Sequence, residues 1–362
     1  MQFLNFMVII TLLLGSSVIA DPIRVTPLKT KPQKIKLCQA RPKPQRGLWM
    51  HYHSGNSYGM GHIIGNTAAE NIAISRLNTW KIKRVYTGLK TLPISNRTDV
   101  AAWNNRLHIN GIQSQLLLGK PHYIFPGAGC RDVLIERIQT RLIDFHEGTG
   151  PGMLGTLTAN ERFDGLHLDI EPHQFKSSYY GNNTPSCAPT SMYWSAATRA
   201  ELFALLYDTL AEVRTYLDNN GHADLPIHID LPYWVDSSSN FDWNTTPDFT
   251  DGSDWIYSTS LIVDGMSFMT YGIDDPNSIR SKIAGERSLL LDSIDVRPAV
   301  NAKERSAWSN TITWTYVSDL KNVVEDLESG TGLLGYGVDI HNYRYLFNPW
   351  PIESVVNNIW VQ

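Results

Sequence analysis

Hydrophobic positions along this chain recur with two periods, one helical and one extended. The clearest helical repeat spans residues 198–218, and its apolar face consists of Leu202, Leu206, Leu210, Val213 and Leu217. Shorter helical patterns cover residues 67–80, 99–109, 131–145, 276–291, 317–327 and 351–360. Between them stand short apolar or alternating runs, which predict strands at residues 47–52, 82–89, 113–118, 163–171, 226–231, 265–271, 297–301 and 334–340.

This alternation of strand and helix predicts an α/β fold. Eight βα units in regular order favour a closed (β/α)8 barrel over an open doubly wound sheet. The first unit lacks a glycine-rich phosphate loop, which argues against dinucleotide binding. We therefore expect one catalytic barrel domain over residues 46–362, with its active site at the carboxyl ends of the strands.

The first 45 residues have a different composition. Residues 1–20 contain the apolar stretch Met7–Leu14 followed by small residues, a pattern typical of a secretory signal peptide. Residues 21–45 form a leader rich in proline and lysine, with little apolar surface to bury. The apolar stretch is shorter than the ~20 residues needed to cross a bilayer. We expect a secreted protein, periplasmic or extracellular, with no membrane span.

Composition narrows the class of partner. The formal net charge is -4, from 31 basic and 35 acidic residues that are interspersed, which argues against nucleic acid or an anionic membrane as partner. The 11 tryptophans and 16 tyrosines exceed what a core of this size usually needs, and they suit stacking on sugar rings. We expect a glycan or polysaccharide substrate, no cofactor, no metal and a monomeric enzyme.

The cysteines predict one disulfide. A chain sent to an oxidising compartment with three cysteines is expected to form one bridge and leave one thiol over. Cys130 and Cys187 follow successive predicted strands, so their loops are neighbours in a barrel. We pair these two, which leaves Cys38 in the leader.

The fourth predicted strand carries the strongest functional signal. Its run Phe163–His173 alternates strictly, so Leu166, Leu168 and Ile170 point one way. His167, Asp169 and Glu171 then point the other way. Two carboxylates about 6.6 Å apart along one strand raise each other's pKa, which suits a general acid at neutral pH. The alternative is a structural ion pair with Arg162 or Lys176.

Polar and aromatic side chains gather where the other strands end. In a barrel these ends meet around one opening, so we expect them to contact the substrate. The candidate substrate-binding residues are Trp49, His51, His167, His173, Asp230, Glu304, His341 and Tyr343. The aromatic segment 174–195 directly follows the acidic pair, and it either walls the substrate groove or packs on its own barrel.

Two of these strands resemble one enzyme family. The run Asp164–Glu171 resembles the Asp-Gly-x-Asp-x-Asp-x-Glu signature on strand four of glycoside hydrolase family 18, the chitinases and endo-β-N-acetylglucosaminidases. The run Asp264–Tyr271 resembles the same family's strand six, which ends Met-x-Tyr-Asp. The chain departs from these patterns at His167, which replaces an Asp, and at Gly272, which replaces the Asp after the tyrosine.

The resemblance implies a role for three residues. Glu171 would be the general acid, and Asp169 would orient the substrate's 2-acetamido group so that its carbonyl attacks the anomeric carbon. Tyr271 would hydrogen-bond that carbonyl. Such enzymes retain configuration without a nucleophile from the protein.

Three other functions fit parts of the same sequence. A retaining glycosidase would pair Glu171 with Glu304 as nucleophile. A metal-dependent hydrolase would use His51 and His53, joined at the mouth by His167, Asp169, His228, Asp230, Asp339 and His341. A sugar-binding barrel without catalysis is the third.

Overall fold

The structure is a computed structural model that describes residues 45–149, 155–237, 241–246, 248–290, 294–304, 313–329 and 337–348. Eight parallel strands form one closed barrel in chain order, β1-β2-β3-β4-β5-β6-β7-β8. They are β1 Arg46–Met50, β2 Ile82–Thr87, β3 Gln113–Leu118, β4 Gly165–Leu168, β5 Ile227–Pro232, β6 Gly265–Met269, β7 Asp295–Asn301 and β8 Val338–His341. The predicted (β/α)8 barrel is confirmed.

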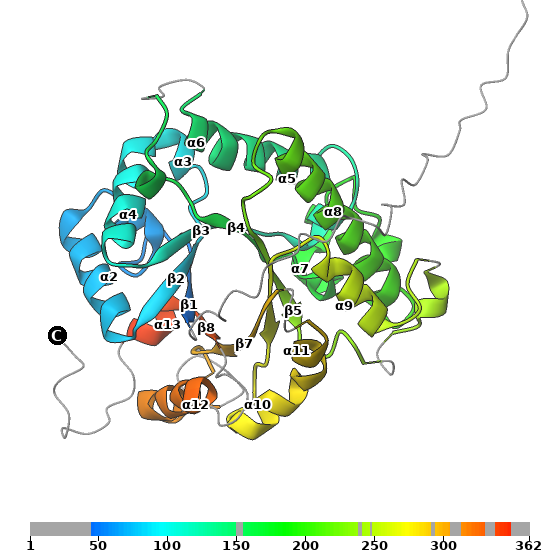
Figure 1. Ribbon diagram of the computed structural model, residues 1–362. Coiled ribbons are helices and arrows are strands. Elements are labelled where there is room, and N and C mark those ends of the chain that lie inside the picture. The colour runs from blue at the N-terminus through cyan, green and yellow to red at the C-terminus, as the bar shows by residue number, and fades with distance from the viewer. Residues whose placement is uncertain are drawn as a thin grey trace, which may run out of the picture. The chain divides into compact units, whose positions relative to one another are not determined.

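Helices surround the strands in a ring (Figure 1). They are α1 Met60–Ile63, α2 Thr67–Thr79, α3 Leu92–Ser95, α4 Arg97–Ile109, α5 Arg131–Ile138, α6 Asp144–Glu147, α7 Ser177–Tyr180, α8 Arg199–Asn219, α9 Gly252–Ser260, α10 Pro276–Lys282, α11 Ala284–Leu290, α12 Val317–Ser329 and α13 Tyr343–Phe347. A π turn, Gln139–Ile143, joins α5 to α6 within the helix predicted at 131–145. The predicted helix at 351–360, the signal peptide and nearly all of the leader lie outside the described residues.

The main core lies between the strands and the helices. Helix α8 buries the predicted apolar face, from Leu202 to Leu217. On β4, Leu166 and Leu168 are buried on the same side. A smaller cluster inside the barrel consists of Trp49, Tyr86, Leu117 and Ala299. Barrel strands have apolar neighbours on both faces, which is why their sequences read as nearly continuous hydrophobic runs.

The inside of the barrel below the strand ends is more polar than the branched apolar layers usual in this fold. Asp339 on β8 is fully buried, and its Oδ1 accepts a hydrogen bond from the Tyr86 hydroxyl at 2.8 Å. Ser267 donates to Oδ2 of the same carboxylate. Arg297 on β7 lies 3.5 Å from Oδ1 and also donates to Asp295 at 2.7 Å. The buried charge is therefore neutralised by groups from three other strands.

Gly47 makes room for this network. It pairs with Asp339 across β1 and β8, and a Cβ at this position would lie 2.0 Å from Asp339 Oδ1. The same holds at Gly265, where a Cβ would lie 1.9 Å from the ring of His228. Large polar side chains fit inside the barrel because glycines stand opposite them.

One disulfide joins the segments that follow β3 and β4. Cys130 and Cys187 are bonded, with their Cα atoms 6.0 Å apart. Cys130 immediately precedes α5, and Cys187 lies in the long segment between β4 and α8. The predicted pairing is confirmed.

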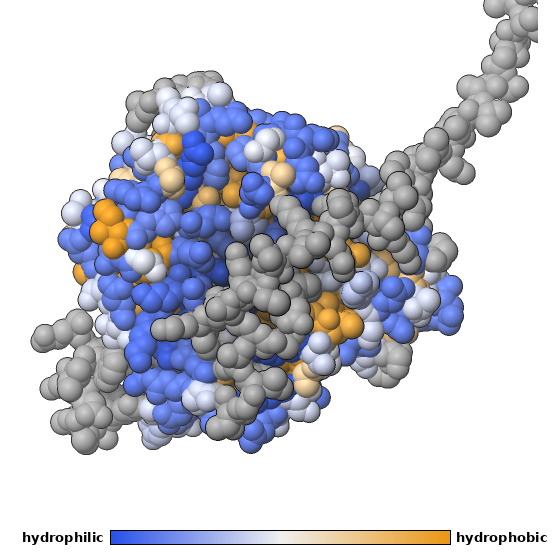
Figure 2. All heavy atoms as spheres, in the orientation of Figure 1, coloured by the Kyte–Doolittle hydropathy of each residue, from blue (hydrophilic) through white to orange (hydrophobic). Residues whose placement is uncertain are grey.

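None of the helices in the described ranges is both long enough and apolar enough to cross a bilayer. On the face drawn in Figure 2, the coloured residues are mainly hydrophilic, and the hydrophobic ones lie in small separate groups. Scattered exposed hydrophobic residues of this kind are normal on a protein surface.

Two acidic side chains are neighbours where the segment after β5 meets α11. Glu286 on α11 is 2% exposed, and neither oxygen of its carboxyl group has a hydrogen-bond partner among the described residues. Asp236 lies beside this helix, with its Oδ2 atom 3.9 Å from where a Cβ on Gly285 would stand. Burial, and then the neighbouring charge of Asp236, raises the pKa of Glu286 to about 8. Glu286 therefore holds a proton at neutral pH.

Replacing Glu286 with glutamine is expected to stabilise the protein increasingly as the pH rises. In the unfolded chain a glutamate loses its proton near pH 4.3, whereas Glu286 in the folded protein keeps it to about pH 8. The folded state therefore binds the extra proton between these values, and wild-type stability falls as the pH rises through that window. Glutamine has nearly the same shape as a protonated glutamate and does not titrate.

The measurement is thermal unfolding of Glu286→Gln and wild type from about pH 5 to about pH 8, the window set by the two pKa values. The Tm of the variant relative to wild type should rise across this range. A Tm difference between the variant and wild type that does not change with pH would contradict the raised pKa of Glu286.

Candidate active site

The candidate site begins where β4 ends. Beyond Leu168 the chain stays extended, and the Asp169 amide donates to the Leu118 carbonyl of β3 at 2.9 Å. A Cβ on Gly119 would lie 2.0 Å from the Asp169 carbonyl oxygen, so only glycine fits next to this strand end. The backbone thus fixes Asp169 over the barrel. Glu171 follows two residues later, as the alternation of the sequence requires.

Three carboxyl groups share this end of the barrel. Loss of hydration, and then the charges of Glu171 and Asp230, raises the pKa of Asp169 well above its usual value. Burial likewise raises the pKa of Asp230, with further contributions from Asp339 and Glu171. These effects favour the protonated form of Asp169. The Glu171 side chain is 26% exposed and therefore reaches solvent.

Below these acids, His167 and Asp230 form a buried pair. Their Nε2 and Oδ2 atoms lie 2.8 Å apart, and the side chains are 0% and 1% exposed. Trp49 donates from its indole nitrogen to the same Asp230 oxygen at 3.3 Å. Burial lowers the pKa of His167 to about 3 and raises that of Asp230, so net charge is disfavoured on both partners. Burial therefore favours the uncharged form of each group.

Two histidines meet beside this pair. The Nε2 atoms of His51 and His341 lie 3.1 Å apart, so one ring donates and the other accepts. His341 Nδ1 lies 3.4 Å from Asn301 Oδ1. Burial lowers the pKa of His51 to about 4, with a further contribution from His53, and Glu171 acts against this shift. His51 therefore lies within electrostatic reach of Glu171.

Tyr271 and Glu304 complete the acidic side of the opening. Burial raises the pKa of Tyr271 well above 10, and the next contributions come from Asp230, Glu171, Asp169 and Glu304. Oε2 of Glu304 accepts hydrogen bonds from the Gly272 amide at 2.6 Å and from the Thr313 hydroxyl at 2.8 Å. Glu304 is 7% exposed, so it is a buried clamp on the turn after Tyr271.

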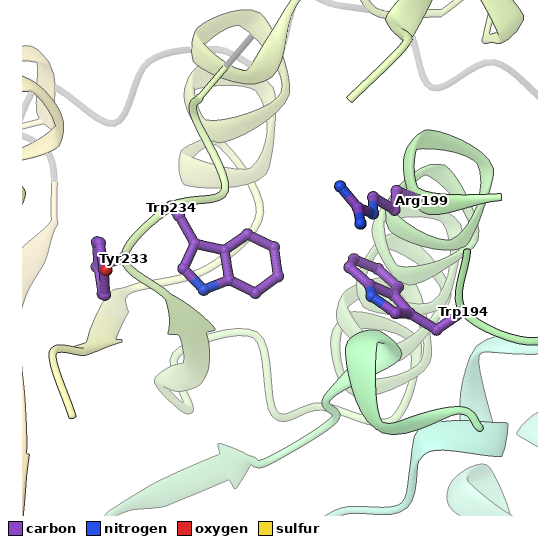
Figure 3. Close-up of a pocket in the computed structure, with 4 residues that line it drawn as sticks. All are labelled: Trp194, Arg199, Tyr233 and Trp234. Atoms are coloured by element: carbon purple, nitrogen blue, oxygen red, sulfur yellow. The ribbon is translucent and has the colours of Figure 1, made fainter. Parts of the chain in front are cut away.

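An aromatic pocket adjoins Glu171. Oε1 of Glu171 lies 3.3 Å from Nε2 of His173, whose ring packs against Trp234 and Trp194 at centroid distances of 5.7 and 6.1 Å. These two tryptophans line a pocket of about 290 Å³ together with Tyr233 and Arg199. Figure 3 shows Trp234 pointing across the pocket towards Trp194 and Arg199.

Three residues of this pocket escaped the sequence analysis. Tyr233 and Trp234 stand directly after β5, whose last residue is Pro232. The rule that strand ends face the site identifies both residues once the strand is known to end at Pro232, whereas the sequence predicted an end at residue 231 and singled out Asp230 within the strand. Arg199 is the first residue of α8 and carries no local sequence signal. Trp194 belongs to the aromatic segment that was considered as a groove wall.

Most of the predicted site residues lie around Asp169 and Glu171, and one lies elsewhere. Trp49, His51, His167, His173, Asp230 and His341 surround the acids as described above. Tyr343 on α13 lies elsewhere: it is 1% exposed, packs against Phe347 and Tyr58, and binds Arg76 of α2 through its hydroxyl at 3.2 Å.

The metal-hydrolase alternative placed His228 and Asp339 at the mouth, and the structure corrects this. His228 lies deeper, hydrogen-bonded to Gln115 at 2.8 Å and 3.5 Å from Arg84. Asp339 belongs to the Arg297 network described above. His53 is exposed. Within the described ranges, no three His, Cys, Asp or Glu side chains converge as a metal site would require.

The structural-ion-pair alternative is also corrected. Across the described residues, neither Arg162 nor Lys176 pairs with Asp169 or Glu171, and Arg162 instead donates to the Leu157 carbonyl at 3.0 Å. The observed partner of Glu171 is His173.

No protein-family model matches this sequence, and no curated protein sequence matches it either. Solved structures with similar folds include a GH18 chitinase from Pseudoalteromonas aurantia, 11% identical over 87% of this chain and 97% of its own, with a TM-score of 0.44. An O-GlcNAc hydrolase variant from Thermobaculum terrenum is 8% identical over 83% of this chain and 55% of its own, with a TM-score of 0.44. A D-psicose 3-epimerase is 10% identical over 82% of this chain and 84% of its own, with a TM-score of 0.42. At sequence identities this low, the similarity concerns the fold alone.

The pairing of His51 with His341 predicts an unusual titration. His51 should remain neutral until the pH falls to about 4, because burial disfavours its charged form. His108 serves as the internal control, since its hydrogen bond to Asp164 raises its pKa above 6.5. The measurement is the imidazole NMR shift against pH. A His51 midpoint at the ordinary value would exclude the buried pair.

Proposed function

We propose that this chain is a glycoside hydrolase in which Glu171 is the general acid. The observation that carries the proposal is the setting of this side chain. Glu171 reaches solvent at the carboxyl ends of the strands, next to Asp169, whose pKa is raised by burial and by two neighbouring carboxylates. Protonation of a glycosidic oxygen is a reaction that calls for such a pair. The aromatic pocket beside His173 offers flat surfaces on which sugar rings stack.

In the proposed reaction, Glu171 gives its proton to the glycosidic oxygen as the bond from that oxygen to the anomeric carbon breaks. The leaving sugar departs with the proton. The oxygen of a water molecule then bonds to the anomeric carbon, and the Glu171 carboxylate accepts the proton that this water gives up. Burial and the neighbouring carboxylates raise the pKa of Asp169, which favours its protonated form while Glu171 is ionised.

A finer part of the proposal concerns the nucleophile. If the substrate carries a 2-acetamido group, its carbonyl attacks the anomeric carbon, with Asp169 and Tyr271 as hydrogen-bond donors to that group. Family 18 enzymes have an Asp after the tyrosine, where this chain has Gly272. Glu304 supplies a carboxylate at that place from a different strand, since its Oε2 binds the Gly272 amide.

The Cys130–Cys187 disulfide supports an extracellular or periplasmic site of action, because such bridges persist in oxidising compartments. The substrate proposed is therefore a glycan outside the cell, and no metal ion or cofactor takes part in the proposed steps.

Glu171→Gln is expected to abolish hydrolysis with little change in stability. Loss of a general acid costs about 10²–10⁴-fold in rate. The ion pair with His173 is partly exposed, and such pairs contribute ~0–1 kcal/mol to stability. The measurement is release of reducing ends from a panel of glycans with and without N-acetyl groups, with a chelator present, alongside the Tm.

Chelator-resistant release by wild type, lost in the variant, supports the proposal and names the sugar. Release only without the chelator would favour a metal-dependent hydrolase. Release from no glycan would favour a sugar-binding barrel, and a large fall in Tm would favour a structural role for Glu171.

Glu304→Gln separates the two glycosidase mechanisms. Its oxygen is already bound to the Gly272 amide and the Thr313 hydroxyl, and a glutamine oxygen accepts the same two bonds. We expect this variant to keep most of its activity. Loss of an enzymic nucleophile would instead cost about 10⁴-fold or more, and a rate restored by added azide would then identify Glu304 as the nucleophile.

A further inference from the structure

The aromatic pocket is sized and lined for one sugar ring. Its volume of about 290 Å³ stands at the lower end of the ~300–1,000 Å³ usual for small-molecule sites. Two tryptophans and a tyrosine supply flat apolar surface, and a single charged side chain, Arg199, also lines it. Figure 3 shows the Arg199 guanidinium beside the Trp194 ring, on the side that faces Trp234.

Arg199 is held in place by its surroundings. Its guanidinium carbon lies 5.4 Å from the centroid of the Trp194 ring, a cation–π arrangement. A guanidinium stacked on an aromatic face still directs its N–H groups outwards in the ring plane, where they match a carboxylate with two parallel hydrogen bonds. The side chain is therefore oriented before any ligand arrives.

The surroundings of the pocket add more positive potential. Lys282 at the end of α10 places its ammonium 5.3 Å from the centroid of the Tyr233 ring. The 21-residue helix α8 begins at Arg199, and its N-cap residue Thr198 makes no side-chain capping bond. The amino end of a helix carries a partial positive charge, which Glu201 in the first turn of α8 partly offsets. Arg199 in the pocket wall and Lys282 behind Tyr233 therefore supply positive charge beside a pocket that adjoins an acidic centre.

We propose that this pocket is a subsite for an acidic sugar, in which the aromatic rings stack on the sugar and Arg199 binds its oxyanion substituent. The inference rests on the proposed function, which it deepens by naming the substrate class: a glycan that contains uronate or sulfated residues. A neutral sugar could bind to the aromatic rings alone and would not require a cationic side chain. An anion close to the Glu171 carboxylate would be repelled unless cations offset that charge.

The test uses three small probes that differ in their substituent: methyl β-D-glucuronide, methyl β-D-glucoside and glucose 6-sulfate. Binding is followed by NMR at the indole N–H signals of Trp194 and Trp234. We expect glucuronide to bind about tenfold more tightly than glucoside, because hydrogen bonds to charged groups are the stronger ones. The preference should weaken with added salt. Comparison with the sulfate distinguishes a planar carboxylate from a tetrahedral oxyanion.

Arg199→Gln should remove the preference for the charged probes, so that glucuronide and glucoside bind with equal affinity. Arg280→Gln is the matched control, because its guanidinium pairs with Asp326 on α12 instead of lining the pocket. Equal binding of glucuronide and glucoside by wild type, or a preference that survives Arg199→Gln, would overturn the subsite. Absence of binding by any probe would overturn it as well.

The same titration on Glu171→Gln keeps the two proposals apart. Probe binding should persist in that variant, since Glu171 does not line the pocket. Hydrolysis of a glycan panel without a preference for charged probes leaves the proposed function standing and rejects the subsite. Charge-selective binding without hydrolysis of any glycan leaves the subsite standing and rejects the proposed function.

Discussion

The carboxylate of Asp339 lies inside the barrel without access to water, and its charge is balanced by Arg297, Tyr86 and Ser267 from three other strands. Removing one partner of such a buried charge typically costs 3–5 kcal/mol, far more than an exposed ion pair contributes. The network also depends on Gly47, since any side chain there would overlap the Asp339 oxygen. Barrel closure and a buried charge are therefore coupled in this chain.

This network determines where chemistry can occur. Its arginines and acids fill the inside of the barrel below the strand ends, so the open space lies at the mouth. Above the network, His167 and Asp230 form a buried pair under the acids. Asp169 comes next, with a pKa raised by burial, and Glu171 is partly exposed at the opening. Charge is thus neutralised in the interior and available only at the opening.

Sequence periodicity predicted the barrel, because strands with two apolar faces and amphipathic helices leave clear patterns. It also predicted which side chains share a face of β4, since alternation is a backbone property. Depth within the barrel was not predictable, because strand stagger sets it; His228 and Asp339 therefore proved to be interior residues.

Contacts between residues that are far apart in the sequence could not be predicted either. Tyr343 follows β8 closely, yet it packs outward against α2. The clamp between Glu304 and Gly272 joins residues 32 positions apart. The two walls of the aromatic pocket are held differently. The segment with Trp194 also contains Cys187, which is bonded to Cys130. The segment with Trp234 continues to Asp236, which lies beside Gly285 of α11. The first wall is tied covalently to the segment after β3, so reduction of the bridge would free one side of the pocket and leave the other side in place.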